Sequence, residues 1–150
     1  MRRSINRIIK ESVNKELIKK LLTSSSWQDI DFIESDIEED NCERLIVTAK
    51  GYEIPIDLIN LKVQYTRLGK YQLHIFIDEY LQGCGIGTKI YTSFIHQFGG
   101  VYSGFGRVMN KDAIMAIYRK LSKEPDIEVK DVVGGDNKTL IGIEANLKDS

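Results

Sequence analysis

The sequence predicts one domain of the α/β (α+β) class, with a mixed central sheet flanked by helices, and three observations lead to this prediction. The chain has 150 residues and 42% of them are hydrophobic, which is enough to bury one core. Segments with strand-like composition alternate with segments whose apolar residues recur at the spacing of an amphipathic helix. A glycine-rich loop joins one of these strands directly to a helix. We therefore expect a single domain over residues 1–150.

The composition argues against several classes of protein. A formal net charge of −1 lacks the clustered excess of Lys and Arg that non-specific binding to nucleic acid needs. Two cysteines, Cys42 and Cys84, are too few for a disulfide-rich secreted domain, and Cys and His together are too few for a tetrahedral zinc site. Neither a signal peptide nor an apolar stretch of roughly 20 residues is apparent. We therefore expect a cytoplasmic protein without a metal, a nucleic-acid partner or a transmembrane segment.

The first predicted element is an amphipathic helix over residues 4–22. Its apolar residues recur at three- and four-residue intervals and form one stripe, which predicts packing against the rest of the domain. Seven Lys and Arg residues fall within the first twenty positions. Docking of this basic helix to a partner or to a membrane surface is therefore the alternative.

An acidic segment follows at residues 29–40. Its seven acidic residues partly alternate with apolar ones, which predicts a strand followed by an acidic turn at residues 38–41. On a strand at the edge of a sheet, these carboxylates would simply be solvated. The alternative is that they attract a cationic amine by long-range steering, without taking part in the chemistry.

The middle of the chain predicts three more strands, over residues 44–49, 52–63 (with an irregular middle) and 71–77. A tight hairpin turn at residues 68–70 separates the last two. The apolar period then changes from two to about 3.6, which predicts a helix over residues 86–98 that ends at a pair of glycines.

The last third of the chain contains one more strand, one more helix and a hairpin. The strand is predicted over residues 101–108, and the helix begins after Asn110 and stops near Pro125. Residues 127–133 and 139–145 predict a closing hairpin, because glycines and an Asn lie between two strand-like runs.

The segment with the clearest chemical signal is the loop Gln82-Gly83-Cys84-Gly85-Ile86-Gly87-Thr88, which lies between the strand over residues 71–77 and the helix. Three glycines within five residues let main-chain N–H groups turn inward, and the N-terminus of the helix adds the positive end of its dipole. Such a loop is suited to binding a pyrophosphate.

Two other phosphate-binding loops do not fit this sequence. In a Walker loop Gly-Lys precedes Ser or Thr, whereas the order here is Gly87-Thr88-Lys89. A dinucleotide-binding fingerprint is G-x-G-x-x-G, whereas Gly83, Gly85 and Gly87 form G-x-G-x-G. These mismatches argue against an enzyme that acts on nucleotide phosphates.

Gln82, Gly85 and Gly87 match the pattern Gln/Arg-x-x-Gly-x-Gly/Ala, so the loop resembles the acyl-CoA signature of the GNAT superfamily of N-acetyltransferases. Residues 73–82 look like the fourth strand of that family, which leads into its pyrophosphate loop. The six-residue pattern alone is short, and a second region adds to it.

That second region follows a strand and lies in a helix, as it does in the family. Asn110, Ala113 and Tyr118 are similar to the family's Asn-x-x-Ala-x-x-x-Tyr, with one residue more between Asn110 and Tyr118 than is usual. The Gly-Phe that follows this helix in the family is absent. The resemblance covers residues 71–121 and implies the GNAT-like acyl-CoA N-acyltransferase fold.

The resemblance implies a binding mode for acetyl-CoA. Main-chain groups of Ile75 and Ile77 would pair with the pantetheine arm, as an added strand does on an open sheet edge. The pyrophosphate would be bound by Gln82 and the main-chain amides of Gly83, Cys84, Gly85, Ile86, Gly87 and Thr88. Asn110 would contact the cofactor or, as the alternative, cap the helix.

The resemblance also implies the chemistry. An acceptor amine would attack the thioester carbonyl directly, and Tyr118 would protonate the departing thiolate. The alternative for Tyr118 is a core residue with its hydroxyl at the rim. Glu79 is the first candidate for the base, with His74 and then the acidic residues Glu34 and Asp36 as alternatives.

We therefore expect an acetyl-CoA-dependent N-acetyltransferase whose acceptor is a primary amine of a small molecule or a protein. Because members of the family often dimerise, a homodimer is one expected assembly. Cys84 is expected to act as a main-chain donor rather than a nucleophile, since no partnered His is close in sequence. The alternative function is a catalytically silent binding or assembly protein that docks through its basic N-terminal helix, in a chain whose composition is similar to that of some phage-encoded proteins.

Overall fold

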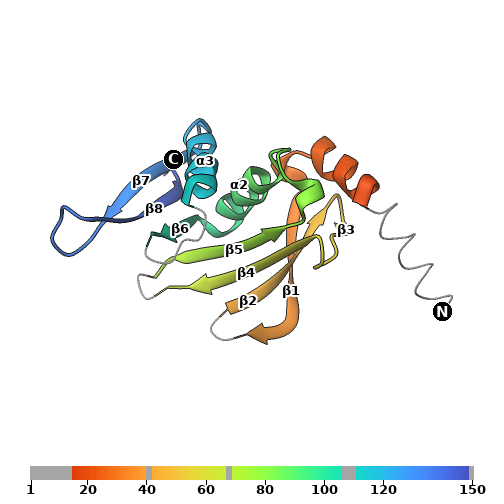
Figure 1. Cartoon of the computed structure of the whole chain (residues 1–150), viewed down its shortest axis with the longest axis horizontal. Helices are drawn as coiled ribbons and strands as arrows, with labels where there is room; N and C mark the ends of the chain where they lie inside the picture. Colours follow the sequence, from red (N-terminus) through yellow and green to blue (C-terminus); the bar gives the residue numbers. More distant parts are fainter. Residues whose placement is uncertain (1–14, 40–41, 67–68, 106–110, 149–150) are drawn as a thin grey trace.

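The structure is a computed structural model that describes residues 15–39, 42–66, 69–105 and 111–148 (Figure 1). The strands in this part of the chain form two antiparallel sheets. Figure 1 shows the helices gathered on one side of the larger sheet. The prediction of the α/β (α+β) class is confirmed at this level, because helices and sheets pack around a shared core.

The first sheet contains β1 (Ile30–Glu39), β2 (Cys42–Ala49), β3 (Tyr52–Glu53), β4 (Ile59–Tyr65) and β5 (Tyr71–Ile77). Its order is β1-β2-β4-β5, and the short β3 pairs with β2. The irregular middle predicted within residues 52–63 is a turn in which the carbonyl of Pro55 accepts the N–H groups of Leu58 (2.9 Å) and Ile59 (3.1 Å).

The acidic segment forms β1, the outer strand of this sheet. Asp31 and Glu34 are exposed there, as expected for carboxylates solvated at a sheet edge. Charged side chains on an edge strand also hinder pairing with a second chain.

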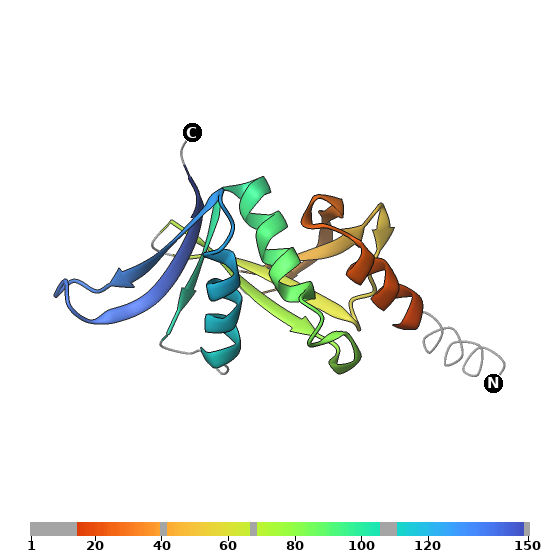
Figure 2. The ribbon, with the colours of Figure 1, turned by 90° about the horizontal axis from the view of Figure 1, so that it is seen from above.

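The second sheet contains β6 (Gly100–Gly104), β7 (Ile127–Val133) and β8 (Leu140–Leu147), in the order β6-β8-β7. The pairing of β7 with β8 confirms the predicted closing hairpin. Strands β5 and β6 contact each other, yet no hydrogen-bonded ladder joins them in the described residues. The strands therefore form two antiparallel sheets rather than one mixed sheet, because β5 and β6 diverge (Figure 2).

Helix α2 (Ile86–Phe98) begins and ends as predicted. It follows Gly85, and it ends at Gly99, whose φ of 98° lets its N–H return to the carbonyl of Ile95 at 2.8 Å. Its buried residues, among them Ile90 and Phe94, pack onto the core of the first sheet. This helix connects β5 to β6 and so spans the two sheets.

Helix α3 (Lys111–Leu121) lies beside α2 and over the second sheet (Figure 2). It buries Tyr118 and Leu121. Asn110, predicted to lie just before this helix, is outside the described residues, as are the last residues of the strand predicted over residues 101–108.

Residues 15–24 are helical and form the described part of the helix predicted over residues 4–22. Ile18 and Leu22 are buried in the domain core, so for this part the prediction of packing on its own domain is confirmed. The ammonium of Lys89 donates to the carbonyls of Leu22 (2.8 Å) and Thr23 (3.1 Å) at the end of this helix. Within the described residues, no helix is long and apolar enough to cross a membrane.

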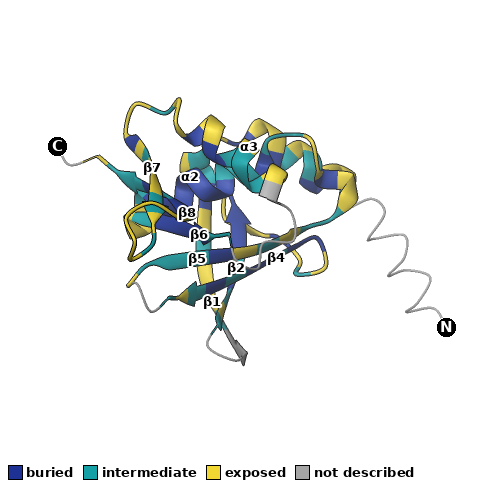
Figure 3. Ribbon diagram, turned by 60° about the vertical axis from the view of Figure 1, so that its left-hand side comes forward, coloured by how far each residue is buried: buried dark blue, intermediate teal, exposed yellow. Residues whose placement is uncertain are grey.

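The first sheet is packed on one face only. Along β4, Ile59, Leu61 and Val63 are buried, whereas the residues between them are half-buried (Figure 3). Phe76 of β5, which pairs with Asn60 and lies on the outer face, is 60% exposed. The helices thus cover the face that also carries the glycine-rich loop.

Candidate functional site

The free edge of β5 is the first component of the site. Asp78 N–H donates to the carbonyl of Leu58 at 2.8 Å, just beyond one end of the β4–β5 ladder, and Thr66 N–H donates to the carbonyl of Lys70 at 2.8 Å beyond the other. Hydrogen-bonded and non-hydrogen-bonded pairs alternate along an antiparallel ladder. Since Lys70 and Asp78 both belong to hydrogen-bonded pairs, every second residue between them directs its main-chain N–H and carbonyl groups toward β4.

By this alternation, the main-chain groups of Ile75 and Ile77 point away from β4. They face the side on which β6 lies, where no ladder partner is described. The two residues predicted to pair with a pantetheine arm are therefore those whose amide and carbonyl groups lie on the free edge.

Gln82 lies at the end of this edge. Its side-chain Nε2 donates to the carbonyl of Ile77 at 2.9 Å. The side chain predicted to contact a pyrophosphate is thus turned back onto the strand. The main-chain carbonyl of Gln82 accepts the Sγ–H of Cys84 at 3.6 Å.

The glycine-rich loop adopts a conformation that needs glycine at two positions. Gly83 and Gly85 have φ values of 80° and 77°, in the left-handed region that favours glycine. Gly85 precedes the first turn of α2 and provides no side-chain cap. The N–H groups of Ile86, Gly87 and Thr88 belong to the first turn of a helix, where no acceptor lies within the helix. These three amides can therefore bind an anion at the positive end of the helix dipole.

Gly87 has a different role from Gly83 and Gly85. A Cβ built at Gly87 would lie 3.6 Å from Cδ1 of Ile77 and 3.6 Å from Cδ1 of Ile117. The first turn of α2, the end of β5 and α3 therefore meet at this glycine. The predicted cofactor loop is consequently held against both the free strand and the helix that carries Tyr118.

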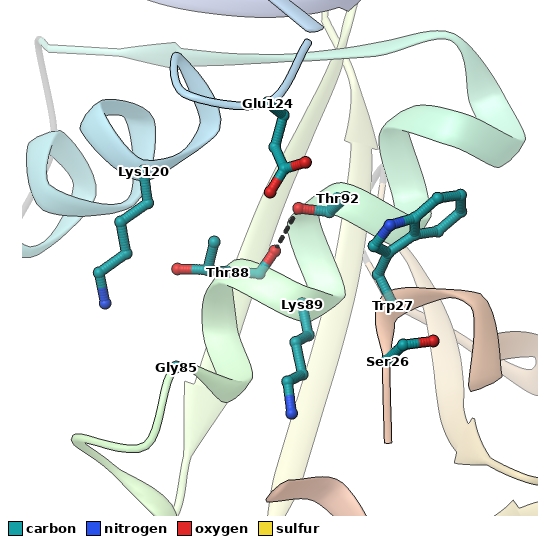
Figure 4. Close-up of a pocket in the computed structure, with 8 residues that line it drawn as sticks. All are labelled: Ser26, Trp27, Gly85, Thr88, Lys89, Thr92, Lys120 and Glu124. Carbon is teal, nitrogen blue, oxygen red and sulfur yellow. Dashed lines mark hydrogen bonds between the residues drawn. The ribbon is translucent and has the colours of Figure 1, made fainter. Parts of the chain in front are cut away.

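A pocket of about 390 Å³ flanks the first two turns of α2 (Figure 4). It is lined by Ser26, Trp27, Gly85, Thr88, Lys89, Thr92, Lys120 and Glu124. Lys89 is directed to the carbonyls at the end of the N-terminal helix, as its hydrogen bonds show. Lys120 of α3 extends on the other side of the first turn, and Glu124 lines the same pocket (Figure 4), so charges of both signs lie beside the loop.

Tyr118 lies in the core, not at its rim. It is 1% exposed, and its Oη is 2.9 Å from Oγ of Ser103 on β6. Its ring packs edge-on against Tyr91 of α2, with centroids 6.1 Å apart. Burial raises the pKa of Tyr118 well above its ordinary value, and the nearby Tyr91 adds to this effect. The phenol therefore keeps its proton at neutral pH.

The candidate bases are distributed unevenly around the site. Glu79 is exposed in the short 3-10 helix η2 (Glu79–Leu81), between β5 and the loop. His74 is exposed on β5, with its Nε2 3.1 Å from Oε1 of Gln64. Burial and the charge of Lys62 lower the pKa of His74, so its imidazole is neutral at pH 7.

The structure does not bring Glu34 to this site. Glu34 lies on β1 and the free edge is on β5, at the opposite end of the strand order of the first sheet. The side chain of Asp36 is outside the described residues. Of the acidic residues proposed as bases, Glu79 is thus the one that lies next to the glycine-rich loop.

Two buried residues near Tyr118 have no signal in the sequence analysis. Ser103 is 2% exposed and Tyr91 is 4% exposed. In the sequence, Ser103 is one residue of a predicted strand and Tyr91 is one residue of a predicted helix, and neither belongs to a motif. Their proximity to Tyr118 arises from the packing of α2, β6 and α3, which residue spacing does not report. Within the described residues, no group of His, Cys, Asp and Glu side chains is arranged to hold a metal ion.

Comparisons with known proteins give little further information. No protein-family model matches the chain, and no curated protein matches it. A crystal structure of a protein of unknown function from Aquifex aeolicus is similar over 91% of this chain and 78% of its own, with 14% identity and a TM-score of 0.35. A likeness at this level supports no conclusion about function.

Proposed function

We propose that the protein is an acetyl-CoA-dependent N-acetyltransferase of the GNAT type that transfers an acetyl group directly to a primary amine of a small molecule or a protein. One observation carries this proposal. The free main-chain edge of β5 leads, within a few residues, into a glycine-rich turn whose helix presents three first-turn amides. An extended arm and a pyrophosphate in one ligand match these two features in that order.

Acetyl-CoA would bind as an added strand followed by an anion. Its pantetheine amides would pair with the main-chain groups of Ile75 and Ile77, which point away from β4. Its pyrophosphate would accept hydrogen bonds from the N–H groups of Ile86, Gly87 and Thr88. The separation of β5 from β6 supports this mode, because in one continuous sheet the same groups of Ile75 and Ile77 would be paired with a strand. Here the carbonyl of Ile77 accepts from the side chain of Gln82, which the pantetheine arm would displace.

In the proposed reaction, the acceptor amine attacks the thioester carbonyl and the thiolate of coenzyme A leaves. Tyr118 donates a proton to the thiolate, and its raised pKa keeps that proton on the phenol until it is needed. Glu79, exposed beside the loop, is the proposed base for the amine, with His74 as the second candidate. A homodimer is the assembly we propose to test alongside the monomer.

Calorimetric titration with acetyl-CoA, with ATP as the control, tests the binding step. We expect acetyl-CoA to bind and ATP to bind much more weakly, because ATP offers no amide-bearing arm for the edge of β5. Release of free thiol against a panel of amines then tests turnover. If acetyl-CoA does not bind, the proposal is rejected.

A pair of substitutions at Thr88 isolates the electrostatic contribution of the loop. Thr88 is the third residue of α2, where Glu is compatible with the helix and complements its dipole. Thr88→Glu places a carboxylate beside the proposed pyrophosphate, whereas Thr88→Gln has the same shape without the charge. We expect acetyl-CoA to bind at least about tenfold more weakly to the Glu variant than to the Gln variant. Equal affinities would place the pyrophosphate elsewhere.

The second candidate function is a binding or assembly protein that retains coenzyme A without turnover. The burial of Tyr118 favours it, because a phenol that is 1% exposed and bonded to Ser103 also suits a purely structural role. Binding of acetyl-CoA without thiol release on any amine would support this second function over the first.

A further inference from the structure

The pocket beside the first turns of α2 has no part in the acetyl transfer proposed above. Its volume of about 390 Å³ falls within the range of small-molecule sites. Gly85 and Thr88 line it and also belong to the glycine-rich loop, so the pocket adjoins the amides proposed to bind the pyrophosphate. A ligand anchored at these amides can therefore extend into the pocket.

The position of the pocket decides which end of acetyl-CoA it can take. In the proposed binding mode the pantetheine arm runs from the loop along the edge of β5, so the acetyl group lies one arm's length from the loop. On its other side, the pyrophosphate carries an adenosine with a 3′-phosphate. The pocket therefore suits the nucleotide end of the ligand rather than the acceptor amine.

Trp27 provides a flat apolar surface in this pocket. It begins the 3-10 helix η1 (Trp27–Asp29), which the carboxylate of Asp29 fixes by accepting the N–H of Ser26 at 2.9 Å. One face of the indole is stacked on His96 of α2, with the ring centroids 3.9 Å apart. Within the described part of the chain, no other aromatic ring and no cation contacts this indole. A purine can therefore stack on its second face.

The charged residues of the pocket also match a nucleotide. Lys89 is engaged, because its ammonium donates to two carbonyls at the end of the N-terminal helix. Lys120 forms no ion pair in the described residues, and Figure 4 shows its side chain extending toward the Gly85 end of the pocket. The carboxylate of Glu124 is directed toward Thr92 instead (Figure 4). An ammonium at one end suits a phosphate, and a carboxylate at the other can accept from the amino group of adenine.

We propose that this pocket binds the 3′-phosphoadenosine end of the acyl donor, an inference that rests on the proposed acetyl transfer. The adenine stacks on the indole of Trp27 and its amino group donates to Glu124, while the 3′-phosphate lies beside the ammonium of Lys120. These three residues then determine donor specificity. They favour acyl groups carried by coenzyme A over acyl groups carried by the phosphopantetheine of a carrier protein, which has no nucleotide.

Calorimetric titration of the whole chain with two donors tests the role of Trp27. Acetyl-phosphopantetheine keeps the arm and the first phosphate of acetyl-CoA but lacks the nucleotide. Trp27→Leu should weaken the binding of acetyl-CoA at least about fivefold, the effect of one lost base–aromatic stack, and should leave acetyl-phosphopantetheine unaffected. Trp27→Phe, which keeps a ring, should retain most of the affinity for acetyl-CoA. Equal losses for both donors in Trp27→Leu would overturn the inference, because they would mean that the substitution disturbs the loop itself.

A third donor, acetyl-dephospho-CoA, tests the role of Lys120 because it lacks only the 3′-phosphate. Lys120→Gln should weaken the binding of acetyl-CoA about threefold and leave acetyl-dephospho-CoA unaffected. Lys123→Gln is the matched control, since Lys123 is exposed just beyond α3 and does not line the pocket.

The wild-type protein separates failure of this inference from failure of the proposed function. If it bound acetyl-CoA and acetyl-phosphopantetheine with equal affinity, the nucleotide would lie outside the pocket. The inference would then be rejected while the acetyl transfer stands. If it bound none of the three donors, the proposed function would be rejected as well.

Discussion

Gly85 and Gly87 lie two residues apart but are glycines for different physical reasons. Gly85 has a φ of 77°, which a residue with a Cβ adopts at a cost of roughly 1–2 kcal/mol. Gly87 is helical, and a Cβ there would make ordinary contacts of 3.6 Å with two Ile methyl groups. Only the first of these positions requires glycine for its backbone.

We therefore expect Gly85→Ala to lower the free energy of unfolding by about 1–2 kcal/mol. Gly87→Ala should leave it unchanged or raise it by up to about 1 kcal/mol, because Ala favours helix over Gly. Urea unfolding followed by circular dichroism measures both. Equal losses would show that the packing around Gly87 is tighter than these contacts indicate.

Tyr91 predicts a dependence of stability on alkaline pH. Burial raises its pKa to about 12, whereas in the unfolded chain the phenol titrates near 10. Between these values the unfolded state has lost a proton that the folded state keeps, so the free energy of unfolding falls as pH rises, by roughly 1.4 kcal/mol per pH unit for this group. Below pH 10 the contribution of Tyr91 is fully present.

Tyr91→Phe should flatten this decline between pH 10 and 12 relative to the wild-type protein, as measured by urea unfolding at a series of pH values. Tyr52→Phe, at a side chain that is 49% exposed on β3, is the control. An unchanged slope in Tyr91→Phe would mean that this phenol is accessible to water in the folded state.

At the scale of elements, two substitutions can test whether the N-terminal helix contributes to the core of the domain. Leu22 is fully buried, whereas Leu17 on the same helix is 57% exposed. Leu22→Ala should reduce the free energy of unfolding by about 2–5 kcal/mol, and Leu17→Ala by less than about 0.5 kcal/mol. Thermal unfolding of the two variants measures the difference. A small effect at Leu22 would show that this helix contributes little to the core and would favour docking to a partner.

The helices and strands were largely predictable from the sequence because their signals are local. The glycines at both ends of α2 mark its limits, since each supplies a left-handed φ where the helix begins or ends. The hairpin between β4 and β5 follows from the turn that contains Gly69, whose φ is 74°. The irregular stretch before β4 contains Pro55, which has no N–H to donate to a ladder.

At the scale of the whole molecule, the sequence did not reveal how the sheets divide. Whether β5 and β6 pair depends on the twist and packing of strands joined through α2, which no residue pattern reports. The proximity of Ser103 to Tyr118 depends on the same packing. The glycine-rich loop was predictable because its conformation depends on residues that are adjacent in the sequence. The surroundings of Tyr118 were not predictable, since three separate elements contribute to them.

The hydrogen bond from Gln82 to the carbonyl of Ile77 has a consequence for how the molecule treats unwanted strands. An unpaired strand edge is a template on which any extended chain, including a second copy, can assemble. Because the amide of Gln82 already occupies the last outward carbonyl of β5, an incoming strand gains no net hydrogen bond there. A ligand that also carries an anion for the amides of α2 has a compensating attraction, and a plain peptide does not. In the proposed binding mode, Gln82 would therefore favour such a ligand over a plain peptide at this edge.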